Sequence, residues 1–262
     1  MIIGGGAAGL SAAETLRQSE YGGEIIVISK ESIVPYDRTL LTKNTLGLDA
    51  NKIVLRSQEF LNTYGIDYHL NQQVKHVDAK RKLVILANDE VVHFDKLLIA
   101  TGGFAVKPIV PGIALKNVFT LRESKDQEAI KQAGAQAKKV VIIGSGFIGV
   151  EFASHLKLTK KEDIQVTIVS NSETTYDRAL GKEVGSAIQK ICEEGGVQFK
   201  FKTTVKEIVG KDGAVVGVEL TDGTCIEADL VLFGTGIQPA TQFIGGQVDL
   251  AKDGSIEVNP FL

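Results

Sequence analysis

The feature that most constrains this chain is a short pattern that occurs twice. Residues 4–9 read Gly-x-Gly-x-x-Gly, and residues 144–149 read the same. Each copy follows a predicted strand, at residues 2–3 and 139–143, and opens a helical pattern, and apolar runs return at residues 24–28 and 165–169. Unbroken apolar runs of this kind are typical of strands buried on both faces of a parallel sheet. The sequence therefore predicts two βαβ units, each built around a glycine-rich turn.

The two units remain similar downstream, which indicates an internal duplication. Short alternating strands follow each unit and are separated by turn signals, for example at residues 88–89 and 211–213. Each series ends in a comparable apolar strand, at residues 96–102 and 229–236. We expect an α/β fold with two Rossmann-like domains, each a three-layer ββα arrangement.

Proline and glycine mark the passages between these domains. Pro108–Gly112 is interpreted as the exit from the first domain, and Gly234–Pro239 as the return to it. The second domain is therefore expected to be inserted into the first. The expected boundaries are residues 1–112 for the first part, 113–236 for the insertion and 237–262 for the return.

Composition argues against several classes of function. Hydrophobic residues make up 44% of the chain and the net charge is −3, without a basic stripe, so no nucleic-acid partner is expected. Cys192 and Cys225 lie far apart and indicate neither a disulfide framework nor a metal site. No apolar run approaches the ~18 residues of a membrane span, and the first residues lack the charged segment of a signal peptide. We therefore expect a soluble intracellular protein, cytoplasmic or organellar, without membrane insertion.

Glycine turns in this strand–turn–helix setting are typical of dinucleotide-binding sites. The glycines permit a tight turn and a close approach of the backbone to a pyrophosphate, which lies at the helix N-terminus. If the motif occurred once, a glycine-rich turn without a ligand would be a reasonable alternative. The presence of two copies in matching settings makes that alternative less favoured. Two such sites in one chain suggest electron transfer between two bound cofactors, one of them a flavin.

The segment after the second predicted strand is polar and contains a proline. It runs from Val34 to Lys43 and follows the carboxyl end of a strand, where ligands bind in α/β sheets. On chemistry alone an ordinary surface loop is an equal alternative.

Four segments together carry a family resemblance. They are the loop Pro35-Tyr36-Asp37-Arg38-x-x-Leu41-x-Lys43, both glycine turns, residues 100–103 (Ala-Thr-Gly-Gly) and residues 234–239 (Gly-x-Gly-x-x-Pro). With them the chain resembles the ferredoxin-reductase branch of the FAD-dependent pyridine nucleotide-disulphide oxidoreductases, most of all the apoptosis-inducing-factor-like, Rieske-associated reductases. The resemblance implies an FAD-binding first domain and an NAD(P)H-binding second domain.

The same resemblance implies the residues that contact the cofactors. For FAD they are Gly4, Gly6, Ala7, Ala8, Gly9, Arg38, Lys43, Thr101 and Gly102. For the nicotinamide nucleotide and its surroundings they are Gly144, Gly146, Phe147, Ile148, Gly149, Glu151, Ser170 and Gly236.

Lys43 and Glu151 are the expected catalytic pair. The resemblance implies that they meet near flavin N5, where a cation favours the reduced flavin and a carboxylate holds that cation in place. A surface carboxylate is the alternative for Glu151. Phe147 is expected either to cover the flavin or to be part of the core.

The ribose-binding positions depart from the usual pattern. Lys30 occupies the place of the first acidic residue, and we choose the next residue, Glu31, for the adenosine ribose of FAD. In the second unit the corresponding residue is Ser170, without an arginine cluster for a 2′-phosphate. Gly149 as third glycine favours NADH over NADPH.

The expected function is therefore a flavoprotein oxidoreductase that transfers hydride from NAD(P)H to FAD. The sequence has no CxxC or CxxxxC beside the expected flavin, so a dithiol reductase is disfavoured, and the resemblance implies a ferredoxin-like or Rieske iron-sulfur protein as electron acceptor. The family's Gly-Asp flavin motif and interface domain would follow Leu262. The alternative is consequently a fragment of such a reductase, or a catalytically impaired nucleotide-binding signalling protein. The four histidines, His155 among them, are interpreted as ordinary residues.

Overall fold

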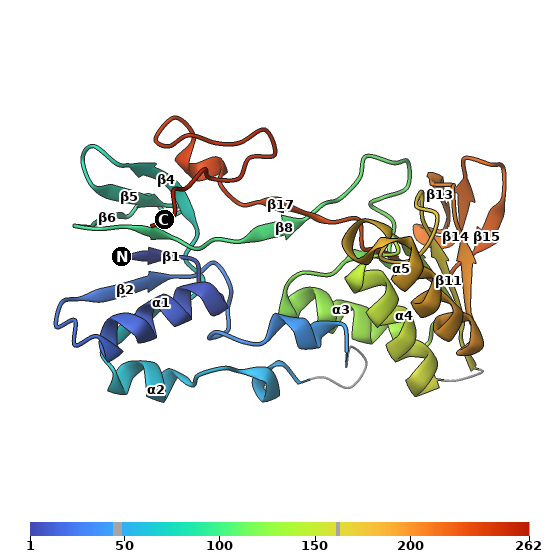
Figure 1. The fold of residues 1–262 in the computed structure, drawn as a ribbon, viewed down its shortest axis with the longest axis horizontal. Coiled ribbons are helices and arrows are strands. Elements are labelled where there is room, and N and C mark those ends of the chain that lie inside the picture. The colour runs from blue at the N-terminus through green and yellow to red at the C-terminus, as the bar shows by residue number, and fades with distance from the viewer. Residues whose placement is uncertain (44–48, 161–162, 262) are drawn as a thin grey trace. The chain divides into compact units, whose positions relative to one another are not determined.

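The chain forms two compact units in the computed structural model, which describes residues 1–43, 49–160 and 163–261 (Figure 1). Unit 1 comprises Met1–Asp37, Asp49–Phe104 and Gln238–Leu262, and unit 2 comprises Arg38–Leu48 and Ala105–Ile237. The chain passes between them in β8 (Gly103–Ala105) and β17 (Ile237–Pro239), which pair as a two-stranded sheet. Within the described residues, no helix has the length and apolar character needed to cross a membrane.

Unit 1 is built on a parallel sheet with the strand order β3-β2-β1-β7. Its strands are β1 (Ile2–Ile3), β2 (Ile25–Ile28), β3 (Ile66–His69) and β7 (Leu98–Ile99). The predicted strand at residues 96–102 is thus regular only at its centre. Gly102 takes a positive φ of 59°, which turns the chain out of the extended conformation.

Unit 1 has three layers (Figure 1). The helices α1 (Ala7–Gln18) and α2 (Gln58–Thr63) cover one face of the parallel sheet, and the antiparallel strands β4 (Val74–Asp78), β5 (Leu83–Leu86) and β6 (Val91–His93) cover the other. Successive strand residues point to opposite faces, so Ile2 packs with Leu10 and Leu61. Ile3 packs instead with Val77 and Val84. The short helices η2 (Ala50–Ile53) and η4 (Gln242–Ile244) complete the unit.

Unit 2 repeats this plan with a parallel sheet in the order β12-β11-β10-β16-β9. Its strands are β9 (Val118–Thr120), β10 (Lys139–Ile143), β11 (Gln165–Val169), β12 (Val197–Lys200) and β16 (Leu230–Phe233). The predicted strands at residues 139–143 and 165–169 are confirmed. Their unbroken apolar composition has the expected cause, because four of five residues in each strand are buried.

Helices and an antiparallel sheet complete unit 2. The helices are α3 (Ser124–Gly134), α4 (Phe147–Lys160) and α5 (Asp177–Glu194), with the short helix η1 (Arg38–Leu41). The antiparallel strands are β13 (Val205–Lys211), β14 (Ala214–Leu220) and β15 (Cys225–Glu227). Val141 and Ile143 of β10 pack against this antiparallel sheet, while α4 packs on β10 and β11. The mixed α/β fold with parallel sheets is the predicted one.

Candidate functional site

The turn between β1 and α1 is tight at two of its glycines. Gly4 has a φ of 119°, and a Cβ atom there would lie 2.2 Å from the carbonyl oxygen of Ala100. A Cβ atom at Gly9 would lie 2.0 Å from the carbonyl oxygen of Gly4. Only glycine fits either position, because both contacts are with backbone that cannot move aside. These two glycines therefore set the turn and the close packing of α1 on β1.

Gly6, the middle glycine, has open surroundings, unlike Gly4 and Gly9. No heavy atom among the described residues lies within 4 Å of the position its Cβ would take. Gly6 is also the N-cap of α1 and offers no side-chain cap to the first amides, and Ala7 and Ala8 are exposed. The first amides of a helix lack partners within that helix and attract anions. The open space and the free amides fit a pyrophosphate.

The turn between β10 and α4 repeats this geometry. Gly144 has a φ of 111°, and its Cβ would lie 2.4 Å from the carbonyl oxygen of Gly234. The Cβ of Gly149 would lie 2.0 Å from the carbonyl oxygen of Gly144. The position of Gly146 is again open within the described residues. Each turn therefore has two closed glycines and one open glycine in the same order.

A cavity of about 380 Å³ lies at the second turn, entirely within unit 2. Gly146, Ser170, Tyr176 and Gly236 are among the residues that line it. Gly236 has a φ of 106°, and no described atom approaches the position of its Cβ within 4 Å. Backbone is therefore exposed to the cavity from both Gly146 and Gly236, as a nucleotide phosphate requires.

Ser170 follows β11 directly and is buried, with 7% of its surface exposed. Its hydroxyl accepts hydrogen bonds from Ser145 Oγ at 2.9 Å and from the Ser172 amide at 3.2 Å. The next acidic residue, Glu173, is bound by Lys182 and Lys202, and these lysines lower the pKa of Glu173. A neutral hydroxyl thus stands where a dinucleotide-binding fold commonly has a carboxylate.

Phe147 is at the start of α4, and 54% of its surface is exposed. The alternative that Phe147 is a core residue is therefore wrong. Its ring lies 4.8 Å from the ring of Tyr176, centroid to centroid, while the neighbouring Ile148 is partly buried. Tyr176 is buried, and this burial, with a smaller effect of the Glu151 carboxylate, raises its pKa to about 12. Tyr176 was not among the predicted residues, because an aromatic residue before a helix is a weak signal in a sequence.

Lys43 and Glu151 are brought together within unit 2. Lys43 Nζ donates to Glu151 Oε2 at 3.1 Å and to the carbonyl oxygen of Thr39 at 2.9 Å. The hydroxyl of Thr42 donates to the same carboxylate oxygen. The side chain of Lys43 is 46% exposed and that of Glu151 27%. Sequence reasoning missed Thr42, although it precedes Lys43 directly.

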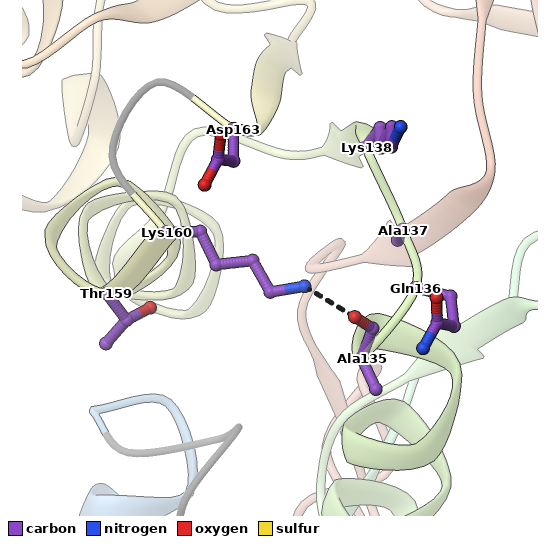
Figure 2. Close-up of a pocket in the computed structure, with 7 residues that line it drawn as sticks. All are labelled: Ala135, Gln136, Ala137, Lys138, Thr159, Lys160 and Asp163. Atoms are coloured by element: carbon purple, nitrogen blue, oxygen red, sulfur yellow. Dashed lines mark hydrogen bonds between the residues drawn. The ribbon is translucent and has the colours of Figure 1, made fainter.

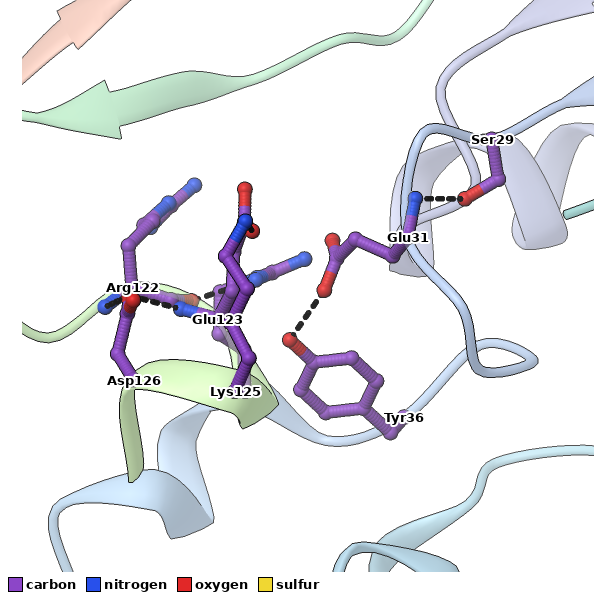
Figure 3. A network of polar contacts seen from close by, with 8 residues as sticks. Ser29, Glu31, Tyr36, Arg122, Glu123, Lys125 and Asp126 are labelled. Atoms are coloured by element: carbon purple, nitrogen blue, oxygen red, sulfur yellow. Dashed lines mark hydrogen bonds and ion pairs between the residues drawn. The ribbon is translucent and has the colours of Figure 1, made fainter. Parts of the chain in front are cut away.

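Arg38 is held at the beginning of α3, also within unit 2. Its Nη1 donates to the carbonyl oxygen of Arg122 at 2.5 Å. The amides of Arg122 and Glu123 donate to the carboxylate of Asp126, and Lys125 lies 2.7 Å from Glu123 (Figure 3). Hydrogen bonds at the helix start therefore fix the carbonyl that positions Arg38. Arg122 was not among the predicted residues.

Glu31 belongs to unit 1 and is held by two polar neighbours of that unit (Figure 3). Its carboxylate accepts a hydrogen bond from the Tyr36 hydroxyl at 2.6 Å, and its amide donates to Ser29 Oγ at 3.3 Å. Tyr36 is in the proline-containing loop that carries the family resemblance. The loop thus orients the carboxylate expected to bind ribose.

Thr101 and Gly102 both contact the return segment of unit 1. The hydroxyl of Thr101 donates to the carbonyl oxygen of Ala240 at 2.8 Å, and the amide of Ala240 donates to Gly102 O at 3.0 Å. These bonds give both residues a structural role, because they join the exit of the chain from unit 1 to its return.

A larger cavity of about 820 Å³ lies elsewhere in unit 2, between the end of α3 and the end of α4 (Figure 2). Lys160 extends into it and donates to the carbonyl oxygens of Gly134 and Ala135, at 2.6 and 3.0 Å. A lysine in this position stabilises the C-terminus of a helix. The arrangement is structural, so the smaller cavity at Gly146 remains the candidate site.

Comparisons with known proteins agree with this geometry. The whole chain, residues 1–262, matches the family model of the pyridine nucleotide-disulphide oxidoreductases. Apoptosis-inducing factor 3 of Homo sapiens is 35% identical over 263 residues, which are 100% of this chain and 43% of that protein. Rubredoxin-NAD(+) reductase of Pseudomonas putida is 31% identical over 261 residues, which are 99% of this chain and 65% of that protein.

A solved structure is similar over most of the chain. It is the ferredoxin reductase for the CYP199A2 system from Rhodopseudomonas palustris, with a TM-score of 0.88 and 29% identity. The match covers 92% of this chain and 60% of that one. The chain therefore spans less than two thirds of the length of each of these three relatives.

Proposed function

Because the chain belongs to the pyridine nucleotide-disulphide oxidoreductase family, we propose that it binds FAD and a nicotinamide nucleotide and transfers electrons between them. The observation that carries this proposal is the repeated glycine turn. In both copies the first and third glycines are closed by backbone, and the middle one is open beside a helix N-terminus. Two equivalent phosphate sites in one chain match a reaction between two dinucleotides.

The proposal assigns one cofactor to each glycine turn. The FAD-binding domain is assigned to residues 1–112 and 237–262, most of which form unit 1, although Arg38–Leu48 and residues 105–112 belong to unit 2. Its turn at Gly6 is assigned to the pyrophosphate and Glu31 to the adenosine ribose. Residues 113–236 are assigned to the nucleotide-binding domain, with its turn at Gly146. The remaining predicted contacts of FAD, among them Arg38 and Thr101, are part of the same proposal.

When bound, FAD supplies the group that accepts hydride from the nicotinamide and releases electrons one at a time. Lys43 is proposed as the flavin contact, because a fixed cation stabilises the negative charge of a reduced flavin. Glu151 and the carbonyl oxygen of Thr39 hold the ammonium group of Lys43, and Thr42 holds the carboxylate of Glu151. The chain thus supplies orientation and charge and requires no general acid.

We propose NADH as the preferred donor, by a small margin. The residues next to Ser170 that line the cavity, Asn171 and Ser172, are neutral. Both lysines near this end, Lys182 and Lys202, bind Glu173. The cavity lining also includes one cation and one carboxylate, Arg178 and Asp177, so a 2′-phosphate would meet both signs of charge and the preference for NADH is small.

A small iron-sulfur protein is proposed as the electron acceptor. The relatives named rubredoxin-NAD(+) reductase and ferredoxin reductase act on carriers of this kind, as their names state. Reduction of a purified rubredoxin and of a ferredoxin by NADH, with the FAD-loaded chain present, tests this part. Turnover with neither carrier, although the flavin is reduced, would contradict the assigned acceptor class and leave the cofactor assignment intact.

The cofactor assignment is tested by titration of the purified chain with FAD, followed by the change in flavin fluorescence. We expect saturable binding that Gly6→Val weakens at least about 10-fold, because the added side chain fills the open space of the turn. The matched variant Gly146→Val should leave FAD binding unchanged and weaken NADH. Equal effects of both variants on both ligands would contradict the assignment of one cofactor to each turn.

A further inference from the structure

Tyr68 of β3 forms a hydrogen bond to the glycine turn of unit 1. Its hydroxyl donates to the carbonyl oxygen of Gly5 at 2.5 Å. Both residues belong to unit 1, and Tyr68 is buried, with 7% of its surface exposed. Gly5 lies between the closed Gly4 and the open Gly6. The bond therefore acts on the part of the turn that is assigned to the pyrophosphate.

This bond determines the direction of the Gly6 amide. The carbonyl of Gly5 and the amide of Gly6 belong to one trans peptide group, and in such a planar group the two point in opposite directions. Because the carbonyl of Gly5 is turned toward Tyr68, the amide of Gly6 points away from Tyr68. No described residue accepts a hydrogen bond from this amide. A donor held in this way beside open space suits a phosphate oxygen.

The peptide between Gly5 and Gly6 needs a restraint of this kind. Residues 4, 5 and 6 are all glycine, and without Cβ atoms the peptide between two glycines has few steric limits on its rotation. A Cβ atom at Gly5 would lie 2.2 Å from the hydroxyl oxygen of Tyr68 and 2.5 Å from Ser29 Cβ. The tyrosine therefore occupies space that a side chain at residue 5 would need, and in return it restrains the backbone there.

The second turn achieves the same restraint by other means. The residue equivalent to Gly5 is Ser145, whose hydroxyl donates to Ser170 Oγ at 2.9 Å. The carbonyl oxygen of Ser145 accepts a hydrogen bond from the Tyr176 amide at 2.9 Å. The second turn is therefore held by its own side chain and by a backbone amide.

The residue of unit 2 equivalent to Tyr68 is Phe199 of β12. Strand pairing places the two at equivalent positions, because each is opposite the residue that pairs with the second residue before its glycine turn. Phe199 has no hydroxyl, so this fold accepts a plain aromatic ring at the position. The hydroxyl of Tyr68 thus serves the turn and not the packing of the strand.

We propose that Tyr68 is a positioning residue for FAD, whose hydroxyl fixes the peptide between Gly5 and Gly6 so that the Gly6 amide is directed at the pyrophosphate. This proposal rests on the proposed assignment of FAD to the first turn. It makes the two dinucleotide sites different, because only the first depends on a side chain from a neighbouring strand.

The variant Tyr68→Phe removes the hydroxyl and keeps the ring. In titrations followed by flavin fluorescence, we expect the Kd of FAD to rise about 10-fold, because a donor to a charged group is no longer held in place. The Kd of NADH should change less than about twofold, since the second turn is unaltered. A matched control is Ile66→Val, which removes one methylene from the same strand and the same core cluster and should leave the Kd of FAD within about twofold. An unchanged Kd of FAD in Tyr68→Phe, or an equal rise in Ile66→Val, would overturn the proposal.

The nuclear magnetic resonance signal of the Gly6 amide tests the restraint without any cofactor. We expect one sharp signal in the unmodified chain and in Ile66→Val, and a broadened or split signal in Tyr68→Phe, because the released peptide exchanges between orientations. An identical Gly6 signal in Tyr68→Phe would overturn the proposal even if FAD bound poorly. If the unmodified chain binds no FAD, the proposed function fails and the role of Tyr68 toward FAD fails with it, whereas the Gly6 signal still reports whether Tyr68 holds the turn.

Discussion

Lys43 Nζ lies 3.1 Å from Glu151 Oε2, although 108 residues separate them in the sequence. The lysine follows η1 and the glutamate is on α4, so the pair joins two segments of unit 2. The side chain of Thr42 donates to the same carboxylate oxygen. Two donors from neighbouring residues therefore converge on Glu151.

Replacing either member of this pair should slow flavin reduction and leave nucleotide binding intact. We expect Lys43→Met and Glu151→Gln each to lower the limiting rate with NADH about 10- to 100-fold, because the first removes the cation where negative charge develops and the second removes the carboxylate that holds this cation in place. Rapid mixing under anaerobic conditions measures this rate, and its dependence on NADH gives the Kd. Rates within twofold of the unmodified chain in both variants would exclude a catalytic role for the pair.

Substitutions at two glycines of the second turn should differ in their effect on stability, because Gly144 is enclosed by backbone and Gly146 is not. Gly144→Ala puts a Cβ at positive φ and 2.4 Å from a carbonyl oxygen, so we expect a loss of more than about 2 kcal/mol in the free energy of unfolding. Gly146→Ala adds a Cβ in open space and should change it by less than about 1 kcal/mol. Urea unfolding measures both, and similar losses would show that Gly146 is packed like Gly144.

Ser170 should control discrimination at the ribose 2′ position. Ser170→Glu introduces a carboxylate that accepts from a ribose hydroxyl and repels a 2′-phosphate, so the preference for NADH over NADPH should rise at least about 10-fold. Binding of 5′-AMP and of 2′,5′-ADP, measured by calorimetry, reports this preference without any flavin. An unchanged ratio of the two affinities would place the ribose elsewhere.

The stability of the chain should depend on pH through His155. Burial lowers its pKa below the ordinary value of 6.5, so the unfolded chain binds a proton that the folded chain resists. The contribution of His155 is therefore fully present above pH 6.5 and is lost as the pH falls through the lowered pKa. The stability of the unmodified chain relative to His155→Phe should accordingly rise with pH in this range. A difference that is independent of pH would contradict the lowered pKa.

Much of the fold could be predicted, because apolar runs and glycine spacing depend only on residues that are close together in the sequence. Apolar runs identified the parallel strands such as residues 139–143, and glycine spacing identified both turns. The contact between Lys43 and Glu151 came only from the family resemblance, since no spacing rule relates residues in distant segments. Their role at a flavin stays a prediction.

The remaining site residues could not be predicted, because a sequence pattern does not show which side chains lie together in the folded chain. Thr42 was not singled out, because its hydroxyl has a role only once Glu151 is known to lie beside the segment that ends at Lys43. The sequence also left open whether Phe147 is exposed, because an apolar residue beside a glycine turn can be either buried or exposed. Its exposure and its contact with Tyr176 are known only from the structure.

We propose that this chain accepts electrons from a nicotinamide nucleotide onto a bound flavin. The most direct test is the visible spectrum of the FAD-loaded chain, recorded before and after anaerobic addition of NADH and, separately, of NADPH. We predict that the oxidised flavin bands disappear with both nucleotides and faster with NADH. A chain that takes up no FAD, or whose flavin stays oxidised with either nucleotide, would contradict the claim.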